Sequence, residues 1–476
     1  MAVLADHSTG SHRKSWLRRW GSDVQATHSR EGEVGYNVLH KGKMGDTLRS
    51  QTVSTQLKQI AEQAADYPEM VFTTLAHKID VNFLREAYHG IRKDAAPGFD
   101  NMTAKEYASD LEKKLFNLHE RLRKDKYIAP PVERVWIEKE NGKDRPIGKP
   151  TIEDKIVQKS VEMLMSAIYD QVFYDFSHGF RKGHSQHQAI HEVREQCRVL
   201  NIECIVSADI TGLFDNIEHS ILRNIIKKKV NDGGILRLIG KWLNAGVVED
   251  ERITYPDKGT PQGGVISPLL SNIFLHYVLD EWFVKEVKGR MKGRSFMSRW
   301  ADDFIIGFEY ESDAQRVLSA LSKRFMRFGL TLHPDKTKLT PFSKPYSLKD
   351  GDKGNGTFDY LGFTFYWSKS RQGYYVIKKK TARKRLNRFM QMLWSWCKEN
   401  RHNTIGKQYN MLSIKLRGFY QYFGVRSNYK SLEVVYEYAE KSWRYWLSRR
   451  SHRGEVMYEE LRKSFPLPFP KIVHNI

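Results

Sequence analysis

The chain contains 476 residues, of which 40% are hydrophobic, so it can bury a large core and form more than one domain. Lysine and arginine number 78 against 56 acidic residues, which gives a net charge of +22 and a pI near 9.6. With 12% aromatic residues, this excess of cations favours a nucleic-acid partner, because phosphates supply counter-charge and bases supply faces for stacking. A membrane-surface protein is disfavoured, since no apolar run approaches the roughly 20 residues of a membrane span and the N-terminus lacks a signal-peptide core. A cytoplasmic protein is therefore expected.

The cysteines and histidines do not indicate a metal site. The three cysteines are too few and too scattered for a disulfide framework, and they form no C-x-x-C pair for a zinc ribbon, so buried thiols are expected. His184, His187 and His191 have helical spacing, but no set of cysteines or carboxylates lies beside them. We expect Ser185 to cap a helix that carries surface histidines.

The first third of the chain predicts helices followed by a hairpin. Residues 1 to about 55 are polar and lack periodicity, which is typical of a flexible or partly ordered extension, and helical patterns follow from about 55, including one helix over 104–122. Residues 135–139 and 145–148 predict two strands joined by a turn at 140–143. If Lys139 and Arg145 face the same way, they form a clamp for a triphosphate. A solvated hairpin with ordinary surface cations is the alternative.

The middle of the chain places aspartates at the ends of apolar strands. After an amphipathic helix over 152–168 and a glycine-rich basic loop over 176–183, the strand 204–210 ends on Asp209. A carboxylate at the end of a buried strand needs a cation or hydrogen bonds, which makes it a candidate site residue. The glycine-rich stretch 258–264 then leads into a helix over 267–278, and its glycines would let the backbone approach a flat ligand, with Gln262 as a polar contact.

Asp302 and Asp303 lie at the tip of a predicted hairpin, between residues 296–300 and 304–306. Alone, such a pair is most often a solvated turn. Their position after the two preceding motifs favours a site instead. Further strand and hairpin elements are predicted around 328–338 and 360–365.

In this order, the motifs resemble those of the reverse transcriptases of bacterial group II introns, from about residue 80 to 450. Asp209 with Phe214 resembles the first palm motif of that family, residues 260–264 the second, and residues 300–303 the catalytic hairpin. The resemblance implies an α+β right-hand polymerase with fingers, a palm built on an antiparallel sheet, and an α-helical thumb or maturase domain. The implied regions are an extension (1–55), N-terminal helices and fingers (56–200), the palm (201–367), the thumb or maturase domain (368–454) and a tail without an endonuclease domain (455–476).

The chemistry of nucleotidyl transfer agrees with this resemblance. It needs two divalent ions, one to activate the primer hydroxyl and one to hold the triphosphate, and hard oxygen ligands suit Mg²⁺. Asp209, Asp302 and Asp303 would supply these ligands, with the main-chain carbonyl of Ile210 as a further one. Three clustered carboxylates repel one another, so the site is expected to depend on metal.

The family's pattern also implies contacts with the substrates. Phe214 would lie under the incoming sugar and exclude a ribose 2′-hydroxyl, although a plain core aromatic is the alternative. The implied dNTP contacts are Lys139, Arg145, Phe214 and Gln262, and the implied template or primer contacts are Arg181, Trp300 and Gly263.

Four positions depart from the family's pattern. Trp300 stands where Tyr or Phe is usual, and Asn101 replaces a glycine. Lys149 replaces an aliphatic residue, and Glu133 stands where a basic residue is common, which weakens the predicted phosphate clamp. None of these changes removes a metal ligand.

The positive charge is concentrated near the C-terminus. From Lys369 onward there are 24 lysines and arginines against 7 acidic residues, which accounts for 17 of the net +22. Helices are predicted over 381–400, 404–422 and 432–448, with cations and aromatics interleaved. This stretch resembles the family's thumb and maturase domain, so it is expected to bind RNA or an RNA/DNA hybrid through Lys378, Lys379, Lys380, Arg383, Lys384, Arg385, Arg388 and Arg417.

The expected function is RNA-dependent DNA synthesis with a group II intron RNA, assisting its splicing and copying it by target-primed synthesis. The implied partners are that RNA in a ribonucleoprotein, an RNA template with a DNA primer, target DNA and dNTPs, with association with the bacterial nucleoid during work on DNA and no membrane partner. Without an endonuclease domain, mobility would borrow its primer from elsewhere. Two alternatives stay open: a host-recruited polymerase in phage defence or repair, and an RNA-binding splicing cofactor that needs no polymerase activity. The presence of all three carboxylates disfavours the second.

Overall fold

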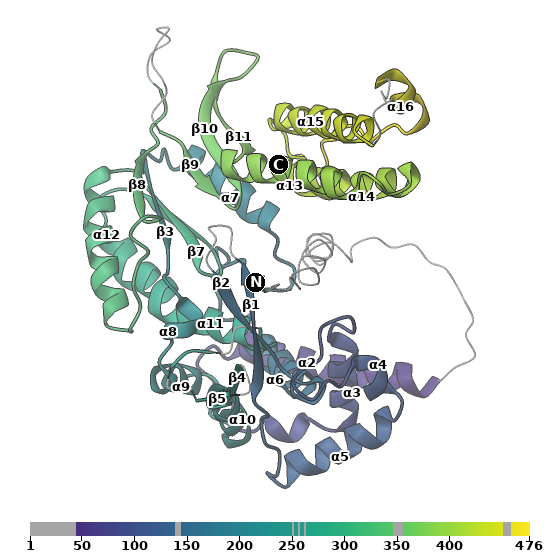
Figure 1. The fold of residues 1–476 in the computed structure, drawn as a ribbon. Helices are drawn as coiled ribbons and strands as arrows, with labels where there is room; N and C mark the ends of the chain where they lie inside the picture. Colours follow the sequence, from purple (N-terminus) through teal and green to yellow (C-terminus); the bar gives the residue numbers. More distant parts are fainter. Residues whose placement is uncertain are drawn as a thin grey trace, which may run out of the picture. The chain divides into compact units, whose positions relative to one another are not determined.

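The computed structural model describes residues 44–138, 144–249, 252–255, 258–260, 263–345, 356–450 and 458–476, with the backbone alone for 44–51, 138, 145 and 458 (Figure 1). Helices and mostly antiparallel sheets are both present, so the α+β prediction is confirmed. The chain divides into two compact units. Of the described residues, the larger unit contains those between 44 and 184 and between 206 and 339, and the smaller unit contains those between 185 and 205 and between 340 and 476.

The helices of the larger unit begin at polar caps. Asp80, Thr103 and Thr151 each accept a hydrogen bond from a backbone N–H in the first turn that follows, which satisfies donors that a helix leaves open. Among the residues that the structure describes, four α-helices precede the first hairpin: α2 (Met44–Asp66), α3 (Val81–Gly90), α4 (Ala104–Ala108) and α5 (Leu111–Arg123). The helix α6 (Ile152–Tyr169) follows it.

Two predicted helix boundaries need correction. The helix α2 begins at Met44, well before the predicted onset near residue 55. The helix predicted over 104–122 is two helices, because Asp110 leaves the helical backbone conformation with φ −129° and ψ 40°. The capping box of Thr103 and Glu106 stabilises the short α4, and α5 then starts afresh.

The first sheet of the larger unit contains the predicted hairpin. β1 (Val132–Glu138) and β2 (Asp144–Lys149) pair antiparallel, with Ile137 opposite Arg145. β4 (Val247–Glu249) and β5 (Arg252–Thr254) complete the order β2-β1-β4-β5, in which β1 and β4 run parallel. This confirms the two strands, and the connecting turn lies outside the described residues.

The second sheet has the order β6-β7-β3-β8 and carries the aspartate motifs (Figure 1). Its strands are β3 (Cys204–Asp209), β6 (Ser295–Trp300), β7 (Asp303–Phe308) and β8 (Lys338–Pro341). The apolar residues Phe304, Ile305 and Ile306 of β7 are fully buried, and α12 (Glu311–Met326) packs on the strand through an edge-to-face contact of Phe325 with Phe304. The sheet is thus a rigid base for the residues at its strand ends.

Helices surround the motifs between β3 and β6. The short α8 (Leu213–Asn216) follows β3, and α9 (His219–Lys227) and α10 (Gly233–Leu243) come next. The helix predicted over 267–278 is α11 (Ser267–Leu275), which continues as a π-helical segment over His276–Asp280. π-helical turns inside α-helices are rare and frequent at functional sites.

The smaller unit combines one sheet with four long helices. Its sheet has the order β11-β10-β9, formed by β9 (Phe358–Tyr360), β10 (Phe363–Lys369) and β11 (Tyr375–Thr381). Its helices are α7 (Gln186–Val199), α13 (Arg383–Asn400), α14 (Ile405–Phe423), α15 (Tyr429–Ser448) and the shorter α16 (Tyr458–Ser464). The three predicted C-terminal helices are therefore confirmed.

The predicted domain boundaries at 200/201 and 367/368 differ from this division. The second boundary would cut β10, whose pairing with β11 runs from Phe363 to Lys369. The first would separate α7 from its partners, because His187 Nε2 lies 2.8 Å from the carbonyl oxygen of Tyr422 on α14. Ser185 caps α7 as predicted, but His187 is buried rather than exposed.

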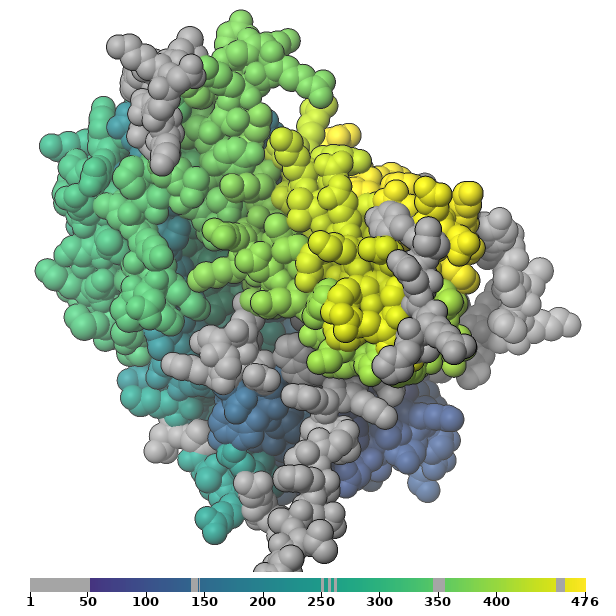
Figure 2. Space-filling model, turned by 45° about the horizontal axis from the view of Figure 1, so that its top comes forward, coloured from purple at the N-terminus to yellow at the C-terminus, as the bar shows by residue number. Residues whose placement is uncertain are grey.

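Residues of the described C-terminal segment, 458–476, pack against the helices of the smaller unit. Arg462 of α16 forms an ion pair with the buried Glu440, and Leu467 is buried. The main-chain N–H of His474 donates a hydrogen bond to the oxygen of Gly424, and the oxygen of His474 accepts one from the N–H of Arg426. In the space-filling view, α15 and the end of the chain form one continuous yellow surface (Figure 2).

Two general expectations can be compared with the described residues. Cys197, Cys204 and Cys397 are buried free thiols, as predicted. Within the described part of the chain, no helix has both the length and the apolar character that crossing a membrane requires.

Candidate active site

The tip of the β6–β7 hairpin is a tight turn. Trp300 and Asp303 are the last paired residues, and Ala301 and Asp302 form the turn between them. Ala301 adopts a left-handed backbone with φ +56°, a conformation that non-glycine residues seldom adopt and that is common at functional sites. The turn leaves Asp302 and Asp303 half-buried at the end of the sheet.

Asp209 ends β3, which is the strand beside β7. Its carboxylate Oδ2 forms an ion pair with the ammonium of Lys336, and its main-chain oxygen accepts a hydrogen bond of 2.8 Å from the N–H of His333. Ile210 follows in an isolated antiparallel bridge with Leu332. The structure therefore already compensates the mostly buried carboxylate with a positive charge, which the sequence did not assign to any residue.

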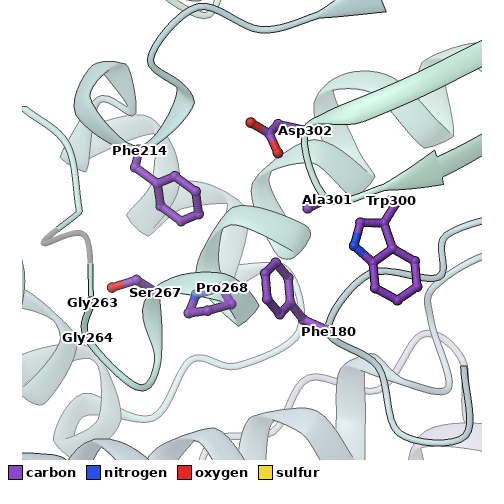
Figure 3. A pocket seen from close by; sticks show the side chains of 9 residues that line it. All are labelled: Phe180, Phe214, Gly263, Gly264, Ser267, Pro268, Trp300, Ala301 and Asp302. Atoms are coloured by element: carbon purple, nitrogen blue, oxygen red, sulfur yellow. The ribbon is translucent and has the colours of Figure 1, made fainter. Parts of the chain in front are cut away.

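A cavity of 270 Å³ lies beside the hairpin tip (Figure 3). It brings together residues from the three sequence motifs and from the glycine-rich basic loop. Its lining residues are Phe180, Phe214, Gly263, Gly264, Ser267, Pro268, Trp300, Ala301 and Asp302. Segments separated by more than a hundred residues thus converge on one pocket, as the ordering of the motifs predicted.

Phe214 is half-buried and its ring points into the cavity (Figure 3). Its main-chain oxygen accepts a short hydrogen bond of 2.6 Å from the N–H of Thr260, which ties α8 to the start of the second motif. A core aromatic would be enclosed by protein atoms on all sides. The ring of Phe214 is instead partly exposed, and it lines the cavity.

Gly263 lines the cavity, but protein packing explains why it is glycine. Its φ is +106°, and a Cβ atom would lie 2.3 Å from the carbonyl oxygen of Gly148 on β2. No side chain fits there. From the sequence alone, the glycine was explained by the close approach of a flat ligand. The structure adds a second explanation, the close approach of strand β2.

A buried polar network supports the same motif from behind. Gln158 accepts a hydrogen bond of 3.4 Å from the N–H of Ile266 and donates one of 2.8 Å to Asp154. Asp154 also accepts hydrogen bonds from the side chains of Tyr127 and Trp242. Burial raises the pKa of Asp154 to about 6, while these three donors oppose that rise. The network holds the start of α11 in place.

Phe180, and not Arg181, is the residue of the glycine-rich basic loop that lines the cavity. Arg181 was predicted to contact template or primer, but its side chain is only 6% exposed. Its guanidinium bonds to Asp170 and to the main-chain oxygens of Tyr174 and Ser177, so it holds the loop together and that prediction is wrong.

Phe180 is instead the ligand-facing residue of this loop. It is 61% exposed, its ring points into the cavity, and its φ of +58° is left-handed (Figure 3). An exposed aromatic side chain on a strained backbone is unfavourable unless a ligand or function compensates. The glycines around it signalled a special backbone, but the sequence did not show which side chain it would present.

Of the three predicted metal ligands, Asp302 lines the cavity, while Asp209 ends β3 and Asp303 begins the neighbouring strand β7. Among the described residues, no three His, Cys, Asp or Glu side chains converge closely enough to hold a metal ion. The donor chemistry nevertheless suits Mg²⁺, because carboxylates are hard oxygen ligands and Asp209 already accommodates the positive charge of Lys336. The sequence predicted that the three carboxylates repel one another without metal. That prediction did not take into account Lys336, whose positive charge lies beside Asp209.

Comparison with known proteins agrees with this geometry. Residues 137–365 match the model of the reverse transcriptase (RNA-dependent DNA polymerase) family. The chain is 39% identical over 200 residues to the group II intron-encoded protein LtrA of Lactococcus lactis subsp. cremoris, covering 42% of this chain and 31% of that protein. It is 30% identical over 313 residues to protein YkfC of Escherichia coli strain K12, covering 58% of this chain and 77% of that protein. The chain belongs to the reverse transcriptase family.

The match to a yeast relative also covers only part of each chain. The putative COX1/OXI3 intron 1 protein of Saccharomyces cerevisiae is 29% identical over 365 residues, which cover 64% of this chain and 43% of that protein. The match to LtrA spans less than a third of the length of that relative.

Two of the departures from the reverse transcriptase pattern compensate each other. Glu133 and Lys149 are directly opposite across the β1–β2 hairpin, and their side chains form an ion pair of 2.7 Å. Asn101 has φ +54°, and asparagine is one of the few residues besides glycine that adopts this conformation readily. The fourth departure, Trp300, lines the cavity in the place of the usual smaller aromatic ring.

The predicted dNTP clamp can be placed only in part. Lys139 and Gln262 lie outside the described residues, and of Arg145 only the backbone is described, at its predicted position in β2. These roles stay predictions.

The predicted RNA-binding cations divide into exposed and buried ones. Lys380, Arg383, Lys384, Arg385 and Arg417 are exposed, and Arg388 is half-buried. The half-buried Lys378 donates a hydrogen bond of 2.7 Å to the main-chain oxygen of Lys369.

Lys379 is the exception among these cations, because its side chain points into the smaller unit. It is 1% exposed, and burial lowers its pKa to about 8. Successive side chains of a strand alternate between the two faces of the sheet, which puts Lys379 on the core side of β11 and Lys380 on the solvent side. The prediction that Lys379 binds RNA is therefore wrong.

Proposed function

We propose that this chain is an RNA-directed DNA polymerase that works with a group II intron RNA. The observation that carries the proposal is that residues of all three polymerase motifs line one cavity, Phe214, Gly263 and Asp302 among them. In this proposal the larger unit contains the fingers and palm, and the smaller unit contains the thumb or maturase region. Its substrates are dNTPs and an RNA template with a DNA primer.

Two Mg²⁺ ions would be held by the carboxylates of Asp209, Asp302 and Asp303, with the carbonyl of Ile210 as a further ligand. When bound, they would lower the pKa of the primer hydroxyl and stabilise the charge on the phosphates. In the protein alone, the Asp209 carboxylate forms an ion pair with the ammonium of Lys336. The ordered hairpin tip fixes where Asp302 and Asp303 leave the sheet.

The cavity walls suit a nucleotide and the end of a primer. Phe214 faces the cavity, so its ring would meet the sugar of the incoming nucleotide and exclude a 2′-hydroxyl by steric overlap. Trp300 would pack against the primer end. The walls expose aromatic faces and few charged groups, which excludes water from the reacting atoms and strengthens electrostatic interactions there.

The basic surface of the smaller unit supports an RNA-binding role. Arg383, Lys384 and Arg385 occupy the first turn of α13, where no acidic residue is present. Cations at a helix N-terminus are unfavourable by about 0.3–1 kcal/mol each, because they face the positive end of the helix dipole. A bound phosphate backbone would offset this cost, so we propose that these residues contact RNA of the intron ribonucleoprotein.

The test is primer extension on an RNA template with Mg²⁺ and dNTPs, combined with an RNA-binding measurement. Asp209→Ala is expected to abolish extension while RNA affinity stays within about twofold, because the substitution lies in the larger unit and removes only one negative charge. Extension at the wild-type rate by Asp209→Ala would refute the proposal.

Asp125→Ala is a matched control. Asp125 also forms a carboxylate–lysine ion pair, 2.9 Å from Lys241, but at the exposed end of α5. This variant should extend primers at the wild-type rate. A similar loss in both variants would mean that the assay reports general destabilisation instead of catalysis.

A further inference from the structure

A completely buried ion pair lies directly behind the hairpin tip. Arg299, the residue before Trp300, and Asp280, the last residue of the π-helical segment, are both 0% exposed. The guanidinium Nε and Nη2 donate to the two carboxylate oxygens of Asp280 at 2.8 and 2.5 Å. Burying two charges is unfavourable unless every hydrogen-bonding group is satisfied, so the rest of the arrangement is informative.

Every N–H of Arg299 has an acceptor. Besides the two bonds to Asp280, Nη1 donates to Asn272 Oδ1 at 2.9 Å and to the main-chain oxygen of Ala301 at 3.0 Å, and Nη2 donates to Ser177 Oγ at 2.7 Å. A guanidinium has five N–H groups in a fixed planar fork, and here five bonds use all of them. The side chain therefore has a single orientation.

These acceptors come from the elements that build the cavity. The oxygen of Ala301 belongs to the strained residue of the hairpin tip, one position before Asp302. Ser177 belongs to the loop that presents Phe180, and Asn272 of α11 donates its own bond of 2.6 Å to the oxygen of Gly179 in that loop. One guanidinium thus links the tip, the loop and α11.

The backbones of the tip and the loop are joined as well. The N–H of His178 donates to the oxygen of Arg299 at 2.9 Å, and the N–H of Arg299 donates to the oxygen of Phe176 at 2.8 Å. A Cβ atom on Gly179 would lie 2.4 Å from the nitrogen of Ala301. The two segments are in direct contact, and the ion pair fixes how they meet.

We propose that Arg299 is a positioning residue for nucleotidyl transfer, which holds Asp302 and Phe180 in register through the Ala301 carbonyl and Ser177. The inference rests on the proposed polymerase function. Arg299 is fully buried behind the cavity and does not line it, so it acts through the residues that do. Displacements of about 1 Å at a reacting group can cost about a hundredfold in rate, which sets the scale of the effect.

The test compares Arg299→Lys with Arg85→Lys. Arg85 is a matched control, because it also grips a carboxylate with two nitrogens, that of Glu112, and bonds Asn82 with the third. It lies on α3 within the larger unit and is not one of the residues that line the cavity. Lysine keeps the charge in both variants but cannot bond to four partners at once.

Single-turnover extension on an RNA template gives the rate constant at saturating dNTP, the dNTP concentration at half-maximal rate and the affinity for template-primer. Arg299→Lys should lower the rate constant about 10- to 100-fold, with template-primer affinity within about twofold of wild type. Arg85→Lys should change the rate constant less than about threefold. Equal rate constants for the two variants would overturn the inference, since both lose an arginine–carboxylate ion pair but only Arg299 bonds to the residues around the cavity.

A second pair covers the case in which Arg299→Lys does not accumulate as folded protein. Asp280→Asn and Glu112→Gln each remove one charge and keep the acceptor oxygen. Asp280→Asn should slow the saturated rate at least about fivefold relative to Glu112→Gln, and equal rates would overturn the inference. If wild-type protein fails to extend primers, the polymerase proposal itself is refuted, which these ratios distinguish from a failure of the positioning role.

Discussion

The hairpin tip of the larger unit and the basic surface of the smaller unit hold their functional residues in opposite ways. At the tip, Ala301 is fixed by a buried guanidinium, and each segment around it contacts another. On the basic surface, Arg383, Lys384 and Arg385 project from the first turn of α13 into solvent. Catalysis requires groups held in one geometry, whereas binding a phosphate backbone requires charge at roughly the right place.

The two regions should therefore respond differently to single substitutions. A single substitution at the tip should lower the rate of extension strongly, because the contacts form one connected network and no neighbouring residue can replace a lost one. A single substitution on the basic surface should act weakly, because neighbouring cations supply similar charge. The two regions should therefore separate the rate of extension from the affinity for RNA.

The largest effect is expected for Asp302→Asn, which keeps the size of the side chain and removes its charge. Loss of a group that stabilises developing charge typically costs about 10²- to 10³-fold in rate. We expect extension to fall by at least that factor, with RNA affinity within about twofold. Asp94→Asn, which removes an exposed aspartate paired with Arg92, should leave both quantities unchanged. A parallel loss of RNA affinity in Asp302→Asn would break the separation of the two regions.

The next effect concerns sugar selection by Phe214. Phe214→Ala should reduce the preference for dNTP over rNTP, measured as the ratio of their kcat/KM values, by about tenfold or more, because a pocket gains room for a hydroxyl. The exposed Phe116 on α5 provides the control, and Phe116→Ala should keep the wild-type ratio. An unchanged ratio together with a lowered melting temperature would identify Phe214 as a core aromatic.

A smaller effect, on binding alone, is expected when three exposed cations of α13 are replaced together. Arg383→Gln, Lys384→Gln and Arg385→Gln in one protein should weaken RNA binding about tenfold at moderate salt. The slope of log affinity against log salt should decrease in magnitude by about 2, as expected when roughly three phosphate contacts are lost.

The saturated extension rate of this triple variant should stay at the wild-type value. The same number of charges can be removed at the end of α5 by replacing Arg123, Lys124 and Lys126 with Gln, all of which are exposed. That control should change the salt slope less. Equal slopes in both triples would show that RNA responds to total charge and not to the surface of the smaller unit.

The smallest functional effect is expected at Lys379, where the change concerns stability. Burial lowers the pKa of Lys379 from 10.5 to about 8, so the folded state disfavours its charge. Stability should therefore rise as the pH increases from about 8 to 10.5, where the unfolded chain still binds a proton that the folded chain has released. Lys379→Met should remove this rise, increase the free energy of unfolding at pH 7 by about 1–3 kcal/mol, and leave RNA affinity unchanged.

Lys380→Met is the natural comparison for Lys379→Met. Lys380 is exposed, with its ammonium 5.1 Å from the centre of the Tyr366 ring. Its replacement should change stability by less than about 0.5 kcal/mol and slightly weaken RNA binding. Reversed outcomes for the two neighbours would contradict the assignment of the faces of β11.

Local pattern was enough to predict most elements and the grouping of the motifs. Apolar runs and the hairpin around Asp302 and Asp303 predicted β3, β6 and β7, and Ser185 was recognised as the cap of α7. The same pattern contained the faces of β11, because Lys379 and Lys380 alternate like any strand residues. Counting the cations as one basic cluster concealed that alternation.

Side-chain direction and long-range pairing could not be predicted from the sequence. The loop around Arg181 was recognised as special, but only the folded chain shows that Arg181 turns inward and Phe180 turns toward the cavity. The ion pairs of Asp209 with Lys336 and of Arg299 with Asp280 join residues 127 and 19 positions apart. Nothing local in the sequence specifies such partners, because they arise from the packing of whole elements.

The ion pair of Glu133 and Lys149 carries a consequence for the evolution of the hairpin. Position by position, the two residues count as two independent losses from the family's pattern. Across the hairpin they form one exchange, because the unusual acid and the unusual base lie opposite each other and neutralise each other's charge. Relatives that carry only one of the two would bear an uncompensated charge, so these positions should covary among the chains that share this hairpin.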